Sequence, residues 1–190
     1  MNPPSSSVIV DPAWVTEVLH FWFAEMGEAH WFAKSEAVDG QVRARFLGLH
    51  ERLVTDHGFG ATSLPQLLAA VIVLDQFSRN LFRGTPRAFA ADAIARGLSR
   101  NAINQGLDVA MKEQERLFLY LPFEHSEDRD DQALSVQLFE RLGNREWTRF
   151  ALEHRAIVDR FGRLPHRNAM LNRHSSADEA AFLRNATEWS

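Results

Sequence analysis

The spacing of apolar residues constrains the fold of this 190-residue chain more than any other feature. Apolar side chains recur every three or four positions along most of the sequence, for example at Trp14, Val18 and Trp22. This is the spacing of the buried face of an α-helix. No stretch of five residues alternates apolar and polar side chains as a half-buried strand would. The sequence therefore predicts an all-α protein.

Capping residues and prolines divide the chain into about eight expected helices. Asp11-Pro12 has the pattern of an N-cap followed by a proline in the first turn, and Ser63-Leu64-Pro65-Gln66 has the spacing of a capping box. Pro122 is expected to kink or end a helix, because a proline inside a helix removes one backbone hydrogen bond. The expected helices roughly cover residues 12–25, 42–53, 64–75, 85–106, 113–121, 130–142 and 146–161, with a short one that begins at the capping box Ser176-Ala177-Asp178-Glu179.

The chain is expected to form one domain over residues 11–190, preceded by a flexible terminus over residues 1–10 that contains two prolines and three serines. This terminus has no basic segment of the kind that opens a secretory signal. Short turns between successive helices favour antiparallel neighbours. The helices are therefore expected either to stack in pairs as a right-handed array or to form a compact bundle.

Composition excludes several classes of function. The longest apolar run, 67–74, is much shorter than a membrane span, and the net charge of -4 offers no general attraction to nucleic acid. The chain has no cysteine, which suits a cytoplasmic protein and removes thiolate chemistry. It also lacks a phosphate-binding glycine loop, a nucleophile elbow and an HExxH motif. We therefore expect no membrane, no nucleic acid, no cofactor and no metal.

Three separated segments mix charged groups with large apolar side chains, which indicates paired charges, a cleft, or both, because charged groups are costly to bury. The first segment, 75–83, places Asp75, Arg79 and Arg83 four residues apart, so they would share one face of a continuing helix. Gln76 and Asn80 form the adjacent row. All five are candidate ligand-binding residues. The alternative is a salt bridge at a helix end.

The second segment, 120–128, contains the candidate catalytic residues Glu124 and His125. A carboxylate beside an imidazole can act as a general acid and base. The alternative is that Ser126 caps the next helix, with Glu127 and Asp128 in its first turn. That alternative accounts for Glu127 and Asp128 better than for Glu124 and His125.

The third segment, 160–168, is the most cationic part of the chain, on a backbone interrupted by a glycine and a proline. Arg163, Arg167 and Asn168 are candidate ligand-binding residues, and His166 is a third candidate catalytic residue. Guanidinium groups on such a turn can hold a carboxylate or phosphate. Alternatively, they neutralise carboxylates of the other two segments. His154, isolated in an expected helix, is predicted to be a packing residue.

These segments resemble a bacterial family catalogued as domain of unknown function 924, over nearly the whole length of the chain. The resemblance implies an all-helical, tetratricopeptide-like fold and brings no established activity, cofactor or catalytic residue. Ser78, Leu164 and Asn172 depart from the family, where proline, phenylalanine and glycine are usual. The resemblance is carried by Leu74-Asp75-Gln76-Phe77-Ser78-Arg79-Asn80 with Phe82-Arg83-Gly84-Thr85, by Tyr120-Leu121-Pro122-Phe123-Glu124-His125-Ser126-Glu127, and by Phe161-Gly162-Arg163-Leu164-Pro165-His166-Arg167-Asn168.

The residues leave three functions open. The first is a cleft that binds an anionic small molecule or a peptide carboxylate through the arginines. The second is a metal-independent hydrolase in which His125 or His166 works with Glu124 or Asp75. The third is a protein-interaction scaffold whose charges form a purely structural network. The scaffold hypothesis predicts a closed, fully hydrogen-bonded cluster of Arg79, Glu124 and Arg163.

Overall fold

The computed structural model describes residues 11–58, 60, 61 and 63–185. This part of the chain is helical and contains no strand, which confirms the predicted fold class. It has eight helices when short 3₁₀ turns are left out and α3, η3 and α4 are counted as the one continuous helix they form. The expected flexible terminus over residues 1–10 lies outside the described residues.

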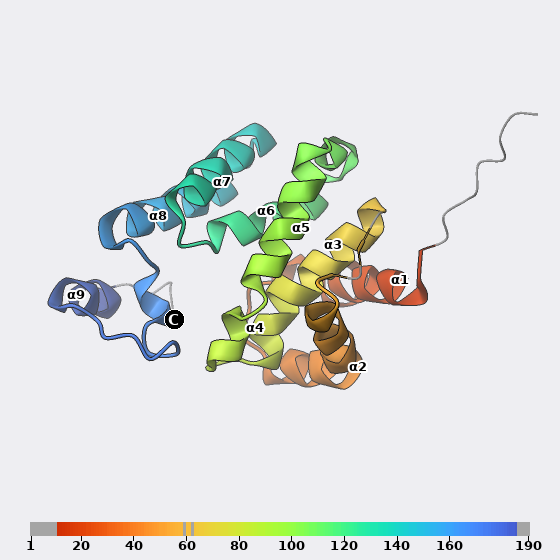
Figure 1. Ribbon diagram of the computed structural model, residues 1–190, viewed down its shortest axis with the longest axis horizontal. Coiled ribbons are helices and arrows are strands. Elements are labelled where there is room, and N and C mark those ends of the chain that lie inside the picture. The colour runs from red at the N-terminus through yellow and green to blue at the C-terminus, as the bar shows by residue number, and fades with distance from the viewer. Residues whose placement is uncertain (1–10, 59, 62, 186–190) are drawn as a thin grey trace, which may run out of the picture.

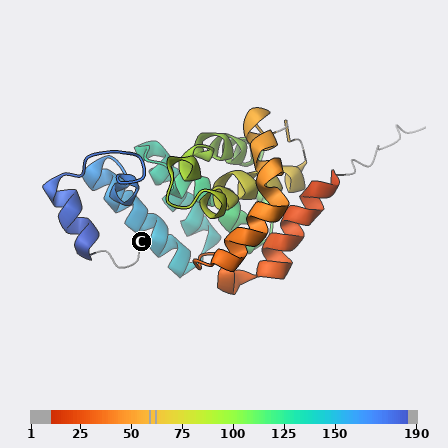
Figure 2. The ribbon, with the colours of Figure 1, turned by 90° about the horizontal axis from the view of Figure 1, so that it is seen from below.

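The first two helices lie at one end of the molecule (Figures 1 and 2). α1 (Ala13–His20) continues into a π-helical segment, η1 (Phe21–Met26), and a 3₁₀ turn, η2 (Glu28–His30), precedes α2 (Glu36–Thr55). Arg45 of α2 joins the two helices, since it donates two hydrogen bonds to Glu25 at 2.6 and 3.2 Å.

The central helix is buried over almost its whole length, as its apolar sequence predicts. It consists of α3 (Leu64–Ile72), a π-helical segment η3 (Val73–Phe77) and α4 (Ser78–Leu81). Ser63 accepts a hydrogen bond from the Gln66 N–H and so caps α3, as the sequence indicates. A π-helical turn widens the helix and changes the direction of the side chains it carries, and such turns often occur at functional sites.

Two expected boundaries are wrong. Thr85-Pro86 opens only the 3₁₀ turn η4 (Pro86–Phe89), and the long helix α5 (Asp92–Asn104) begins after it, followed by the 3₁₀ turn η5 (Leu107–Ala110). Pro122 does not end its helix: α6 extends over Glu113–Glu124 and His125 caps it. Because Pro122 lies in the last turn, the helix loses a backbone hydrogen bond only where it is about to end.

The C-terminal helices follow the capping signals closely. α7 (Arg129–Leu142) ends at Gly143 and α8 (Arg145–Phe161) ends at Gly162, both glycines in the left-handed conformation that favours this residue. A 3₁₀ turn, η6 (Pro165–Arg167), leads to α9 (Ala177–Asn185) at the other end of the molecule (Figure 1).

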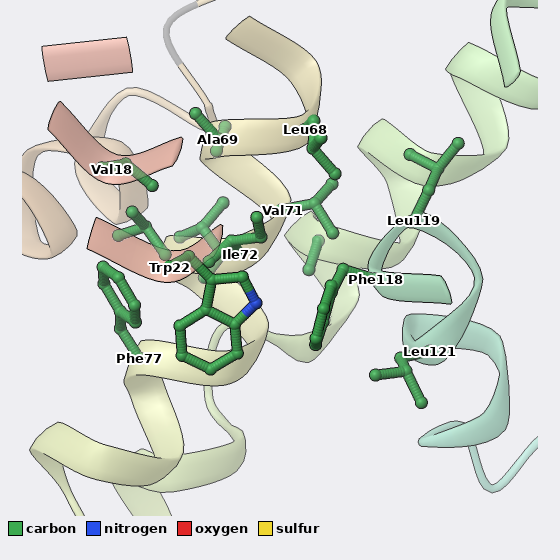
Figure 3. Close-up of a cluster of buried hydrophobic side chains, with 14 of the residues drawn as sticks. Val18, Trp22, Leu68, Ala69, Val71, Ile72, Phe77, Phe118, Leu119 and Leu121 are labelled. Atoms are coloured by element: carbon green, nitrogen blue, oxygen red, sulfur yellow. The ribbon is translucent and has the colours of Figure 1, made fainter. Parts of the chain in front are cut away.

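Aromatic side chains join the N-terminal helices to the centre of the fold (Figure 3). The Trp22 ring contacts Phe77 of the central helix and Phe118 of α6, with ring centroids 5.5 and 5.2 Å apart. This core fixes the helix that carries Asp75. A separate small cluster of Ile157, Val158 and Leu164 supports the C-terminal segment. None of the described helices combines the length and the apolar character that crossing a bilayer would require.

Candidate functional site

α6 and α8 lie side by side and run in the same direction, with α7 packed against both. Near the start of the two helices, Asn144 contacts the Glu113 carboxylate at 3.4 Å. Near the end of α6, the His154 Nδ1 lies 3.2 Å from the Glu124 carboxylate. The two contacts lie 11 residues apart on α6 and 10 residues apart on α8. The two helices therefore run alongside each other over about three turns.

A cavity of about 730 Å³ lies along this helix pair. Its wall includes exposed residues such as Phe32, which is 64% exposed, so the cavity reaches the surface. The side chains of the wall are of two kinds: one kind is apolar, either aromatic or aliphatic, and the other is ionisable. The lining residues are Glu28, Trp31, Phe32, Arg79, Phe89, Leu117, Leu121, Glu124, His125, Phe139, Glu146, Trp147, Phe150, His154, His166 and Arg167.

Asp75 holds His125 in a defined orientation. The Asp75 side chain is completely buried within η3, accepts a hydrogen bond from Gln76 at 2.6 Å and lies 2.9 Å from the His125 Nδ1. Burial disfavours the ionised carboxylate, but Arg79 and His125 outweigh this effect and hold the pKa of Asp75 below its ordinary value. A carboxylate can only accept, so Nδ1–H donates to it. His125 Nε2 has no protein partner among the described residues.

Asp92 binds two arginines that come from distant parts of the chain. Arg79 of α4 donates to both Asp92 oxygens, at 2.7 and 3.1 Å, and Arg167 of η6 donates to one of them at 3.2 Å. Both guanidinium groups lie over the Phe89 ring. Burial lowers the pKa of Arg167, whereas at Arg79 the attraction of Asp75 and Asp92 exceeds the effect of burial and raises the pKa.

Glu124 is buried in its neutral form, and two of the three cavity histidines, the half-buried His154 and His166, are also neutral. Burial, with a contribution from Asp75, raises the pKa of Glu124 to about 8. Burial lowers the pKa of His154 to about 3 and that of His166 to about 4. The His154 Nδ1 lies 3.0 Å from the Phe150 carbonyl oxygen, which can only accept, so this nitrogen carries the proton. The inner end of the cavity therefore holds a carboxylic acid and neutral imidazoles at pH 7.

The predicted site residues divide into two groups. Arg79, His125, Glu124, His166 and Arg167 all line the cavity. Asp75 and Gln76 lie directly behind it, since Asp75 contacts two of those residues and Gln76 donates to Asp75. These seven residues, from all three charged segments, are brought together by the fold.

The remaining candidates lie elsewhere. Asn80 and Arg83 both bind Asp39 of α2, at 2.8 Å, and Arg83 lies beyond the end of α4. Arg163 binds Glu179 of α9, at 2.6 and 2.8 Å, and Asn168 donates to Ser175. These four residues have their partners outside the cavity wall.

The capping alternative for the second segment is partly wrong. Asp128, rather than Ser126, caps α7: its carboxylate accepts from the N–H groups of Asp130 and Asp131 at 2.9 and 3.1 Å. Glu127 is outside the helix and binds Arg173 at 2.7 and 2.8 Å.

Sequence reasoning missed two residues of the site. Asp92 gives no local signal, because its arginine partners lie 13 and 75 positions away. His154 was expected to pack, yet it lines the cavity beside Glu124. The four-residue spacing of Glu146, Phe150 and His154 was the available signal, since it places all three on one face of α8. Among the described residues, no group of three histidine or carboxylate side chains is arranged to hold a metal ion.

The shared carboxylate of Asp92 should be a major source of stability. Asp92→Asn would leave the buried Arg167 guanidinium without its counter-charge and the half-buried Arg79 with Asp75 alone, so we expect the free energy of unfolding to fall by about 3 kcal/mol or more. Arg83→Gln, which breaks an exposed pair, should cost within about 1 kcal/mol. Urea denaturation of the two variants measures both values, and equal losses would contradict the importance of the shared carboxylate.

The raised pKa of Glu124 predicts a pH dependence with a definite sign. The folded protein keeps this proton up to about pH 8, whereas the unfolded chain loses it near the ordinary value of 4.5. Native stability should therefore decline between these pH values relative to Glu124→Gln, by at most about 1.4 kcal/mol per pH unit, with a constant difference above pH 8. Urea midpoints measured across this range test the expectation.

Glu127→Gln is the control with the opposite sign. Burial opposes ionisation of Glu127, but the hydrogen bond from Arg173 prevails and lowers its pKa. This variant should therefore be less stable than the native protein at neutral pH, and the difference should close as the pH falls through the acidic range. If the difference in stability between the native protein and Glu124→Gln does not change with pH, the assignment of a neutral Glu124 is overturned.

Comparison with known proteins places the chain in a bacterial family of unknown function. No curated protein matches it. One solved structure, the protein of unknown function ATU0120 from Agrobacterium tumefaciens, is similar, with a TM-score of 0.82 and 38% identity over 92% of this chain and 98% of that one. The model of a bacterial protein family of unknown function matches residues 18–187. The chain belongs to this family, DUF924.

Proposed function

We propose that the cavity binds a small molecule that has one carboxylate and an apolar body. The observation that carries this proposal is the state of Arg167. The Arg167 side chain lines the cavity and is about 7% exposed. Only its Nη1 donates a hydrogen bond to Asp92. Its Nε is buried without a partner among the described residues. A ligand carboxylate bound side-on to the Nε–Nη2 edge would supply this missing partner once the buried Nε turns toward the cavity.

The charge balance favours a single negative charge on the ligand. Asp75 and Asp92 already offset Arg79 and Arg167, and the carboxyl of Glu124 is neutral below about pH 8. A phosphate would add two negative charges to this balanced set, whereas a carboxylate adds only one, which Arg167 can bind through the guanidinium edge that Asp92 leaves unused. This distinguishes a carboxylate from a phosphate ligand.

The rest of the wall suits an apolar body. Trp31, Phe139, Trp147 and Phe150 line the cavity together with two leucines of α6. Ligand pockets of this size typically combine such apolar walls with a few polar groups that fix orientation. The scaffold hypothesis expects Arg163 within a closed cluster, but Arg163 lies away from this cavity, with Glu179.

Calorimetry with octanoate, octanol and octyl phosphate tests the proposal. We expect saturable binding of octanoate and weaker binding of the other two molecules. Arg167→Gln should weaken octanoate binding by about tenfold or more, because a hydrogen bond to a charged group contributes about 1.5 to 3 kcal/mol. Arg163→Gln, which removes an arginine outside the cavity, should leave it unchanged. Equal affinity for octanoate and octanol, or insensitivity to Arg167→Gln, would overturn the proposal.

A second function, ester or amide hydrolysis, is favoured by the Asp75–His125 pair beside a protonated Glu124. In this reaction, His125 Nε2 takes a proton from water and the water oxygen attacks the carbonyl carbon. Glu124 then gives its proton to the leaving group as the bond to that group breaks. The proton on His125 returns through solvent to restore Glu124. A neutral carboxylic acid beside an imidazole that a buried carboxylate orients is an arrangement typical of hydrolytic sites.

Hemiesters of succinate, which carry a free carboxylate, test this second function. His125→Gln should lower kcat/KM by at least about a hundredfold, while His174→Gln, outside the cavity, should not change it. Glu124→Gln should slow hydrolysis of the alkyl hemiester. It should not slow hydrolysis of the nitrophenyl hemiester, because nitrophenolate leaves without a proton. Activity on the alkyl hemiester should also decline above about pH 8, where Glu124 ionises. Absence of turnover, or turnover that survives His125→Gln, would exclude this function.

A further inference from the structure

We propose that the ligand of this cavity is a zwitterion, with an ammonium group at the end opposite to its carboxylate. This inference rests on the proposed carboxylate site and defines the class of ligand more closely. It arises from the way the charged residues of the wall are distributed along α6 and α8.

The contacts between elements place the two ends of the cavity. Glu146 lies two residues after Asn144, which contacts Glu113 at the start of α6. Glu28 lies 3.5 Å from the amide of Gln114, so it belongs to the same end. At the other end, Glu124 meets His154. Eight residues of α8 separate Glu146 from His154, and at 1.5 Å per residue the two ends are about 12 Å apart.

The outer end carries two carboxylates without an opposing charge. Glu28 and Glu146 both line the cavity and are exposed, and within the described part of the chain neither forms an ion pair with a basic side chain. The dipole of α8 stabilises Glu146, which lies in its first turn. That explanation does not extend to Glu28, which comes from a different element. The inner end differs, because its carboxylates Asp75 and Asp92 are paired with Arg79 and Arg167.

Aromatic rings surround the outer end as well. Trp31 and Phe32 follow Glu28 closely in the chain, and Trp147 and Phe150 follow Glu146 in α8. Trp31 is held in place by a 2.9 Å hydrogen bond from its ring nitrogen to the Trp22 carbonyl. Faces of tryptophan and phenylalanine attract ammonium groups, and neighbouring carboxylates add to that attraction. The outer end thus has both features of a binding site for an organic cation.

The distance between the ends limits the ligand further. A carboxylate at Arg167 and an ammonium near Glu28 and Glu146 must be separated by an apolar spacer of about 10 Å, given the length of the helix pair. An α-amino acid is too short to reach both ends. An ω-amino acid with a medium-length chain spans them, and its methylene groups would contact the leucine and aromatic wall.

Calorimetric titration with octanoate and with ω-aminooctanoate tests the inference directly. The two probes share the carboxylate and the chain length, and only one carries the terminal ammonium. We expect the native protein to bind ω-aminooctanoate about fivefold or more tightly than octanoate, as one favourable cation–π site implies. Raising the salt concentration should reduce this preference.

Paired variants locate the origin of the preference. The double variant Glu28→Gln with Glu146→Gln should bind both probes equally while its octanoate affinity is retained or increased. The matched control, Glu36→Gln with Glu140→Gln, removes two exposed carboxylates that do not line the cavity, so it should keep the native preference.

The outcomes separate this inference from the proposed function. Octanoate binding without a preference for ω-aminooctanoate would overturn the zwitterion and leave the carboxylate site standing. A preference that survives the Glu28 and Glu146 double variant would also overturn it. Failure of both probes to bind would reject the carboxylate site and the zwitterion together.

Discussion

The carboxylate of Asp92 is the interaction on which the site depends. It accepts from Arg79 at the end of the central helix and from Arg167 in the turn after α8. Among the residues that the structure describes, no apolar cluster joins these two segments, because the small cluster around Val158 is separate from the main core. A buried charge requires a partner, so Asp92 positions both guanidinium groups within a few ångströms of each other. Asp92 therefore sets the positions of Arg79 and Arg167 at the polar end of the cavity.

The apolar core and the polar site are coupled through one short helical segment. Phe77 packs against Trp22 and the ring of Phe46, whereas Asp75, two residues earlier in the same π-helical segment, faces His125. The widened turn also accommodates a hydrogen bond from Arg79 to the Asp75 carbonyl at 2.8 Å. The position of His125 is therefore set by packing on the opposite side of the helix, which makes the imidazole a rigid part of the cavity wall.

The helix plan could be predicted because its signals are local. Ser63, Asn144 and the glycine after α7 cap helices within a few residues of their own position. The site could be predicted only in part, because its partners are distant in sequence. Arg83 was expected on the face of Arg79, but α4 ends at Leu81 and Arg83 turns to Asp39. Asp92 and His154 gain their roles only from neighbours that other helices supply. The tetratricopeptide-like arrangement stays a prediction.

The wall of the cavity draws on residues from Glu28 to Arg167, which spans most of the described chain. During synthesis, the N-terminal helices and the central helix can pack before the segment after α8 has been made, and Asp92 then has Arg79 alone as its counter-charge. The end of the cavity proposed to bind a carboxylate is complete only after Arg167 has been made. Ligand affinity would thus distinguish a fully folded chain from one whose C-terminal third is absent or displaced, even where the aromatic core has already formed.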